Sequence, residues 1–283
     1  MSAGRLSIAA VGALLLASGP VGAGAKKAYL QGYDALGRPG VELGLRAKAE
    51  KASRLRFRPD LEDEVVRFHL AGRLLGSAKT NDDGVAAIRH TFNKAGRYTV
   101  TATLGDRSKY AAEPGSFLVA VHDANTRFVV CDVDHTLAGV SAAKFVFKKN
   151  EDVPALPGSV EVLTQAAKHY AILYVTARDD AFMNTTRGWM ALRKFPPGPV
   201  FFWDFGRKKT SHRKYKTREI AAIKEQFPHL VIGLGDKASD ARAYLANGLR
   251  AIIIHPERDD DLPRQAVWVK SWSQAEPHLL PRQ

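Results

Sequence analysis

The sequence predicts an antiparallel β-sandwich followed by an α/β domain with a doubly wound parallel sheet, and two patterns support this. Short runs of alternating polarity, separated by turn residues, fill residues 26–123, and this spacing is typical of β-sandwiches. From Phe128 onward, continuous apolar runs alternate with helical segments. Such runs fit parallel strands that are covered on both faces. A chain of 283 residues is long enough for two ordinary domains.

Residues 1–25 have the pattern of a secretory signal. One charge, Arg5, precedes the apolar run from Ile8 to Ala17, and the small residues Ala23–Ala25 follow. The run is shorter than the roughly 20 apolar residues that a transmembrane helix needs. We therefore expect cleavage near Ala25 and a secreted or periplasmic mature protein. The alternative is a leader that is not cleaved.

Charge and cysteine content restrict the partners and the redox chemistry. The formal net charge is +13, which favours anionic partners. The single cysteine, Cys131, excludes internal disulfides. Because it stands in an apolar run, we expect a buried structural thiol.

The N-terminal domain, predicted over residues 26–123, carries no catalytic constellation. Its histidines, His69 and His90, are interpreted as surface or packing residues, because neither has a second ligand at a metal-site spacing. The stretches Thr80–Ala86 and Ala95–Ala102 resemble bacterial immunoglobulin-like repeats. A spacer, a surface or protein-binding module, and a lid all remain open. The expected strands are Glu42–Ala47, Glu64–Leu70, Gly84–His90, Tyr98–Leu104 and Phe117–Val121.

After a polar linker, His122–Thr126, the α/β domain is predicted over residues 126–283. Its first strand, Phe128–Cys131, ends in Asp132 and Asp134. In open α/β sheets ligands bind at the carboxyl ends of the strands. Two carboxylates at this place can share one divalent cation, although an isolated pair also occurs in plain surface turns.

Further polar residues follow the later strands. Ala171–Val175 ends in Thr176, and Val231–Gly235 is followed by Asp236, with Asp240 four positions on. A cluster of cations precedes the last of these strands. Within this cluster Lys216 is expected to face the sheet, because the residues at i+4, i+7 and i+11 from it form an apolar stripe on the same side of a helix. The other cations are interpreted as a solvated face or as a surface that attracts an anionic membrane or a polyanion. The cluster is Arg207, Lys208, Lys209, Arg213, Lys214, Lys216 and Arg218.

In their order, these motifs resemble those of the haloacid dehalogenase superfamily of phosphotransferases. Three further stretches look like the lipin-type (LNS2) phosphatidate phosphatase domain and its relative in phosphatidylinositol-transfer proteins: Tyr174–Arg178, Thr186–Trp189 and Gly198–Val200. That second relative lacks a full pair of aspartates and is regarded as a binding module. Because this chain has both carboxylates, the resemblance favours catalysis.

The resemblance implies a role for each motif residue. Asp132 is the expected nucleophile, and Asp134 the general acid and base. Mg²⁺ is the expected cofactor, held by Asp132, the Asp134 main-chain carbonyl, Asp236 and Asp240. Thr176 and Lys216 are expected to hold the phosphoryl oxygens. The candidate substrate-binding residues are Thr136 and Arg178.

The chain departs from the superfamily at His135, where glycine is common. Histidine tolerates left-handed backbone angles better than a β-branched residue, so we expect altered detail and retained activity. The segment Ala138–Pro157 is too short for a large cap domain. We expect a short flap, in which Phe145 and Phe147 either pack as a strand or contact lipid.

An open site suits a bulky anionic phosphomonoester such as phosphatidate. The alternatives are a broad-specificity secreted acid phosphatase and a phosphatidate-binding module without turnover. The β-sandwich is expected to have a protein or surface partner, and nucleic acid is not expected as a partner.

Overall fold

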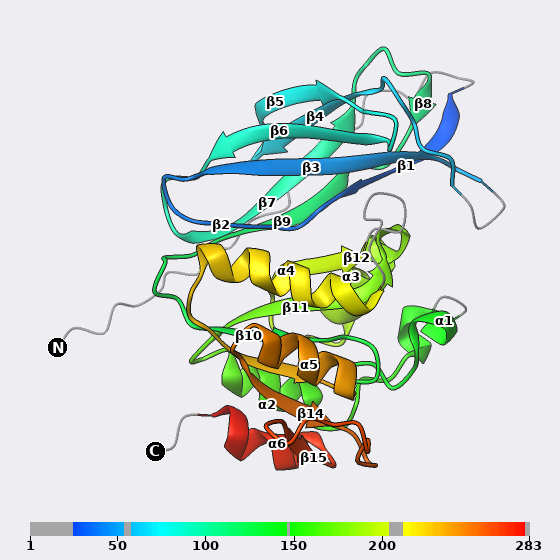
Figure 1. The fold of residues 1–283 in the computed structure, drawn as a ribbon. Helices are drawn as coiled ribbons and strands as arrows, with labels where there is room; N and C mark the ends of the chain where they lie inside the picture. The colour runs from blue at the N-terminus through cyan, green and yellow to red at the C-terminus, as the bar shows by residue number, and fades with distance from the viewer. Residues whose placement is uncertain (1–24, 54–57, 146–147, 204–211, 281–283) are drawn as a thin grey trace.

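The structure is a computed structural model that describes residues 25–53, 58–145, 148–203 and 212–280. It contains a β-sandwich and, beneath it, an α/β domain with a parallel sheet (Figure 1). This is the predicted fold class. The expected leader lies outside the described residues, except for Ala25.

Two sheets form the sandwich, and their inward residues are small or apolar. In β3 (Glu42–Lys51) the inward side chains Leu45, Ala47 and Ala49 are fully buried. Alternate residues bury one face of a strand, which explains the polarity pattern of the sequence. The first sheet has the order β6 (Val85–Thr91), β3, β1 (Lys26–Gly32) and β8 (Tyr110–Ala111). The second has the order β2 (Ala35–Gly37), β9 (Gly115–Val121), β7 (Gly96–Leu104), β4 (Val65–Leu70) and β5 (Arg73–Lys79).

All five strands expected in this domain are present, and β1, β2, β5 and β8 are additional. The sequence of β5 does not alternate in polarity, and its side chains are exposed or only half-buried. An edge strand of this kind leaves little trace in a hydrophobic pattern.

The parallel sheet has six strands in the order β12, β11, β10, β13, β14 and β15. The chain moves outward from β10 to β12 and then returns to the other side of β10 with β13, so the carboxyl end of β10 is a topological switch point. Ligands bind at such points in open α/β sheets. The strands are β10 (Phe128–Cys131), β11 (Ala171–Asp179), β12 (Val200–Trp203), β13 (Leu230–Gly235), β14 (Arg250–Ile254) and β15 (Val267–Val269).

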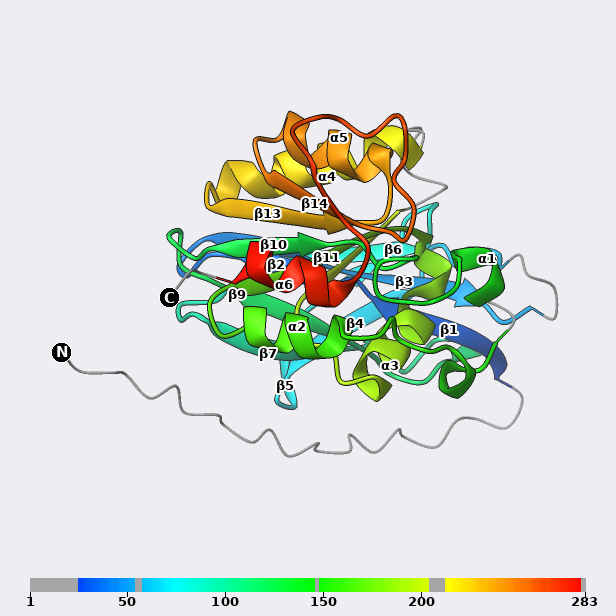
Figure 2. The same cartoon turned by 90° about the horizontal axis from the view of Figure 1, so that it is seen from below.

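Helices cover both faces of this sheet, as expected for a doubly wound fold (Figure 2). On one face lie α2 (Ser159–Ala166), α3 (Met183–Leu192) and α6 (Trp272–Leu279). On the other lie α4 (His212–Gln226) and α5 (Ala238–Ala246). Cys131 is buried between the two layers, as predicted, and burial raises the pKa of its thiol.

The expected flap strand is wrong. Residues Ala142–Phe145 form the short helix α1, and Asn150–Asp152 a 3-10 turn. Phe145 is 1% exposed and meets Trp189 edge-on, with the ring centroids 5.6 Å apart, so it packs into the domain and does not face a lipid surface. Phe147 lies outside the described residues.

The two domains share apolar packing. Tyr33 of the sandwich belongs to the core on the α2 face, and Leu36 and Ala120 belong to the core on the α4 face. The sandwich therefore covers the β12 edge of the parallel sheet (Figure 1). Within the part of the chain that the structure describes, no helix is long and apolar enough to cross a membrane.

Candidate active site

Asp132 lies at the carboxyl end of β10 and is only 2% exposed. Its N–H donates to the Leu234 carbonyl at 2.9 Å, which ties the start of the loop to β13. Lys216 Nζ lies 2.8 Å from Asp132 Oδ1. Ile220 and Ile223 are buried on the same face of α4, so the apolar stripe turns Lys216 toward the sheet.

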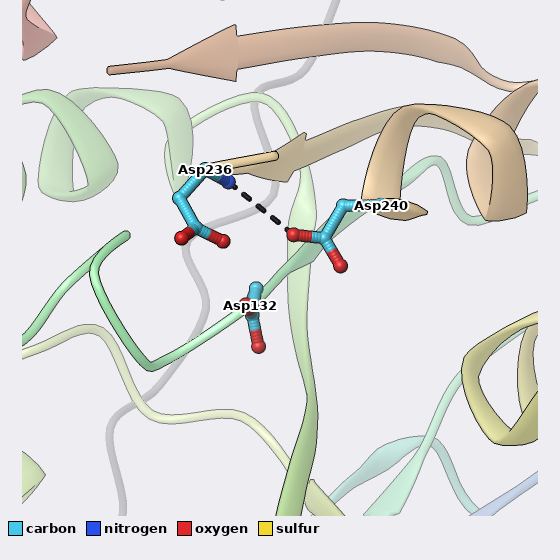
Figure 3. A group of neighbouring side chains, drawn as sticks. All are labelled: Asp132, Asp236 and Asp240. Carbon is cyan, nitrogen blue, oxygen red and sulfur yellow. Dashed lines mark hydrogen bonds between the residues drawn. The ribbon is translucent and has the colours of Figure 1, made fainter. Parts of the chain in front are cut away.

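Asp236 and Asp240 complete a cluster of three carboxylates (Figure 3). Asp236 follows β13 and Asp240 lies in the first turn of α5, and one oxygen of each of the three aspartates lies within 4.8 Å of the others. The Asp236 N–H donates to Asp240 Oδ2 at 3.3 Å. A Cβ at Gly235 would lie 2.5 Å from the Asp240 Cβ, so glycine is required for this close approach.

Burial and mutual repulsion set the protonation of the aspartate cluster. Burial, opposed by Lys216, raises the pKa of Asp132 to about 6. Burial and the nearby Asp240 raise the pKa of Asp236 to about 8. Burial acts in the same direction on Asp240, but the charges of Lys216 and Lys237 and the hydrogen bonds from Asp236 and Lys216 together outweigh it and lower the pKa of that carboxyl. Asp132 and Asp240 thus share one buried lysine, Asp236 lies beside the partly exposed Lys237, and an additional cation would relieve the remaining negative charge.

The donor set fits a hard divalent cation. Asp236 Oδ1 lies 3.5 Å from Lys237 Nζ, yet it is buried and finds no hydrogen-bond partner among the described residues. The buried hydroxyl of Thr136 also lacks one there. Carboxylate oxygens are the ligands that Mg²⁺ prefers. The Asp134 side chain is not part of this cluster, which is consistent with a contribution from its main chain alone.

Asp134 faces Arg178 instead. Arg178 Nη2 donates to Asp134 Oδ1 at 2.9 Å, and Nε donates to Oδ2 at 3.1 Å. Arg178 Nη1 also donates to Thr186 of α3 at 3.0 Å, and the Phe145 ring centroid lies 3.8 Å from the guanidinium carbon. This fork geometry fixes the orientation of the Asp134 carboxylate.

Thr176, which lies inside β11 because the strand extends to Asp179, joins this second group. Its hydroxyl lies 3.5 Å from Asp134 Oδ2 and accepts the N–H of Arg178 at 3.2 Å. Both side chains are buried, with 0% of Thr176 and 2% of Arg178 exposed. The structure thus brings Thr176 and Arg178 beside Asp134.

The loop that follows Asp134 has the left-handed backbone at His135 that the sequence suggested. His135 has φ 55°, in the left-handed region, and its side chain is exposed. Thr136 is 0% exposed, and its carbonyl accepts the indole N–H of Trp272 from α6 at 2.8 Å. The C-terminal helix α6 therefore holds the loop after Asp134 in place through this hydrogen bond.

Some neighbours of the site were not expected from the sequence. Thr186 and Asp180 lie well after the first motif, and Tyr33 comes from the other domain. The closeness of Asp180 to Thr176 in the sequence and the place of Thr186 in the stretch Thr186–Trp189 could have suggested two of them. Among the cations considered beside Lys216, Lys214 and Arg218 are exposed, whereas Arg207, Lys208 and Lys209 lie outside the described residues.

Residues 129–255 match the family model described as the LNS2 domain of PITM 1-3. No curated protein matches the chain. Among solved structures, a D,D-heptose 1,7-bisphosphate phosphatase from B. bronchiseptica, complexed with magnesium and phosphate, is 16% identical and has a TM-score of 0.45. The match covers 54% of this chain and 98% of that one.

A haloacid dehalogenase-like hydrolase from Streptococcus pneumoniae is 10% identical, with a TM-score of 0.41 and coverage of 55% and 99%. The sandwich is similar to a CARDB domain from Pyrococcus furiosus, at 16% identity, a TM-score of 0.24 and coverage of 34% and 92%. TM-scores this low carry no argument about function. The family model covers residues 129–255, and over this range the chain is similar to LNS2 domains.

Proposed function

We propose that this protein is a Mg²⁺-dependent phosphomonoester hydrolase that works through an aspartyl-phosphate on Asp132. The observation that carries the proposal is the position of Asp132, which belongs to the carboxylate cluster and whose Oδ1 lies 2.8 Å from the Lys216 ammonium. One buried carboxylate thus stands beside both a cation site and a fixed positive charge. This is the arrangement that attack on a phosphoryl group requires.

Asp132 and Asp236 are the side chains that would hold Mg²⁺, together with the Asp134 main-chain carbonyl. Asp240 would be a further ligand or would orient Asp236, to whose N–H it is hydrogen-bonded. When bound, Mg²⁺ neutralises charge on the phosphoryl oxygens and on the cluster. A cation held there would also favour the ionised form of Asp132, which is the form that attacks phosphorus.

The chemistry then proceeds in two displacements. An Asp132 oxygen forms a bond to phosphorus while the bond to the leaving oxygen breaks. Asp134, which takes a proton from the entering phosphomonoester monoanion, gives that leaving oxygen the proton. In the second step Asp134 takes a proton from a water molecule, whose oxygen attacks the aspartyl-phosphate. Inorganic phosphate leaves and both carboxyl groups return to their starting state.

Thr176 and Lys216 would hold the phosphoryl oxygens during both steps. Arg178 is a third candidate for binding the phosphoryl oxygens. In the free protein its guanidinium is paired with Asp134. A phosphate that enters the site competes for this guanidinium and releases Asp134 for proton transfer. Arg178 would thus couple substrate binding to the availability of the acid.

Phosphatidate, or a similarly bulky anionic phosphomonoester, is the proposed substrate. In its described residues the segment over the site contains only α1 and one 3-10 turn, so a large alcohol group would have room outside. Lys144, Lys148 and Lys149 of this segment are exposed, and cations near a site opening attract anionic lipid surfaces. The LNS2 match and the leader pattern also support a lipid substrate and an exported protein, respectively.

The test is phosphate release by the chain without residues 1–25, with Mg²⁺, from phosphatidate vesicles and from p-nitrophenyl phosphate. We expect turnover of phosphatidate well above that of the soluble ester. Asp132→Asn should lose at least about 1,000-fold in kcat, because it removes the nucleophile. Asp106→Asn, which changes an exposed carboxylate of the sandwich in the same way, is the matched control and should keep full activity.

Preference for the soluble ester would replace the lipid substrate with the broad-specificity acid phosphatase. Binding of the vesicles without phosphate release from either compound would overturn catalysis in favour of a phosphatidate-binding module. Full activity of Asp132→Asn would exclude the proposed nucleophile.

A further inference from the structure

Part of β11 that contributes to the site lacks its neighbour in the sheet. The register between β11 and β12 shifts between Thr176 and Asp179, so Ala177 and Arg178 have no partner residue in β12. A bulge of this kind re-aims side chains, but it also removes the ladder that would fix them. The positions of Thr176 and Arg178 therefore depend on contacts outside the sheet.

One of these contacts comes from the β-sandwich. Tyr33, between β1 and β2, donates its hydroxyl to Asp180 Oδ2 at 2.5 Å. Asp180 directly follows β11 and is 2% exposed, and Lys48 of β3 places its Nζ 3.7 Å from the same oxygen. A hydrogen bond to a buried carboxylate is short and strong. The far end of the bulge is thus held by the other domain.

A second contact holds the neighbouring strand. The Asp34 carboxylate accepts the N–H of Leu118 in the sandwich at 2.8 Å and the N–H of Val200, the first residue of β12, at 3.0 Å. One carboxylate thus connects the sandwich to β12, the strand that pairs with β11 on either side of the bulge. Burial raises the pKa of Asp34, and Arg187, 3.3 Å away, opposes this.

A third contact reaches Arg178 through α3. Arg187 donates to the carbonyls of Gly32 and Ser116 in the sandwich, at 2.5 and 3.2 Å. The residue before it, Thr186, accepts the hydrogen bond of Arg178. The orientation of α3 on the sandwich therefore determines the position of Thr186, which accepts a hydrogen bond from the Arg178 guanidinium.

From these contacts we infer that the β-sandwich is a positioning part of the phosphatase site, and that Tyr33 acts through Asp180 to place Thr176 and Arg178. The inference rests on the proposed function of that site and gives the sandwich a role there. It makes Tyr33 a positioning residue, because its contact is with Asp180 and not with the reacting atoms. A displacement of about 1 Å in such a site can cost on the order of 100-fold in rate.

The experiment compares Tyr33→Phe with Tyr98→Phe in the chain without residues 1–25. Both changes remove one hydroxyl and its hydrogen bond, but Tyr98 bonds to Lys94 on the exposed side of the sandwich. For Tyr33→Phe we expect kcat to fall about 10-fold while KM stays within about 2-fold. Tyr98→Phe should match the unchanged protein.

Orthovanadate inhibition separates positioning from a partial loss of folded protein. A smaller active fraction lowers kcat but leaves the inhibition constant unchanged. Displacement of Thr176 and Arg178, in contrast, weakens the binding of vanadate, an anion that resembles the phosphoryl group. We expect the inhibition constant to rise about 10-fold in Tyr33→Phe. Asp180→Asn should behave alike, and the double variant should lose no more than either single one, because the two side chains act through one contact.

Unchanged kcat and unchanged vanadate inhibition in Tyr33→Phe would overturn the inference, as would an equal loss in Tyr98→Phe. If the unchanged protein hydrolyses no phosphomonoester, the proposed function fails and the inference is decided by binding of inorganic phosphate with Mg²⁺, measured by calorimetry. Weaker binding in Tyr33→Phe alone then supports the positioning role. Equal binding in all three proteins contradicts it.

Discussion

The two halves of the site differ in how their charges are balanced. The aspartate cluster contains Asp132, Asp236 and Asp240, of which Asp132 and Asp240 contact Lys216, and the Asp236 pKa is raised to about 8. The arginine cluster, defined as Asp134, Thr176, Arg178, Thr186 and Asp180, pairs each of its charges with a protein group.

This difference indicates in which half the charges are neutralised by protein groups alone and in which half a bound cation is needed. In the arginine cluster, Arg178 is 1% exposed at its side chain and meets a carboxylate, a hydroxyl and an aromatic face. Such a group is assembled on folding and rigidifies the site. The aspartate cluster keeps an excess of negative charge, so we expect the free energy of cation binding to complete it. Substitutions in the two halves should therefore change stability in opposite directions.

The largest effect is expected for Arg178→Met. The variant leaves Asp134 without its counter-charge, and breaking a buried pair costs about 3–5 kcal/mol. Because the Asp134 side chain keeps 15% exposure, we expect about 3 kcal/mol, the lower end of that range. Chemical denaturation measures it, with Arg67→Met, which breaks the exposed pair with Asp106, as the matched control. An Arg178→Met protein as stable as this control would show that the arginine cluster is not held by its charges.

The second prediction has the opposite sign. Asp236→Asn should make the metal-free protein more stable at pH 8.5, because it removes a buried carboxylate that is repelled by Asp240. The same variant should lose at least about 100-fold in kcat/KM and in Mg²⁺ affinity, since it removes a proposed ligand. Thermal unfolding with a chelator and calorimetric titration with Mg²⁺ give the two readouts. Lower stability together with unchanged Mg²⁺ binding would contradict the assignment of this cluster.

The smallest effect concerns pH. The folded-state pKa of Asp132 is raised to about 6 and that of Asp236 to about 8. The folded protein thus binds more protons than the unfolded chain from about pH 4 up to these values. Stability from these groups is greatest at low pH and is lost as the pH rises through the folded pKa.

Without metal, we therefore expect a Tm a few degrees lower at pH 8.5 than at pH 5.5, at about 2–4 °C per kcal/mol. Mg²⁺ should reduce the difference by binding the ionised carboxylates, and Asp236→Asn should reduce it without metal. A pH difference of equal size in Asp236→Asn would assign it to other groups. The comparison of the two proteins makes the test specific, because all other titrating groups are shared.

The sequence predicted the aspartate cluster more completely than the arginine cluster. Asp132, Asp236 and Lys216 follow strands or face a sheet, and strand ends and helical phase can be deduced from apolar periodicity. The ties through Tyr33, Asp34 and Arg187 could not be predicted, because they join residues roughly 150 positions apart by polar contacts that have no period. Phe145 was assigned to the wrong element for a related reason: its burial depends on Trp189, in another helix.

The shared apolar packing has a consequence for how the chain folds. Leu36 and Ala120 are buried only when α4 and the parallel sheet are present, although the sandwich is synthesised first. Until those later segments have been synthesised, the sandwich exposes an apolar surface that is prone to aggregation and that a chaperone can bind. Once the last helix has docked, heating should melt both domains in one cooperative calorimetric transition, since neither can lose its structure without exposing the core of the other.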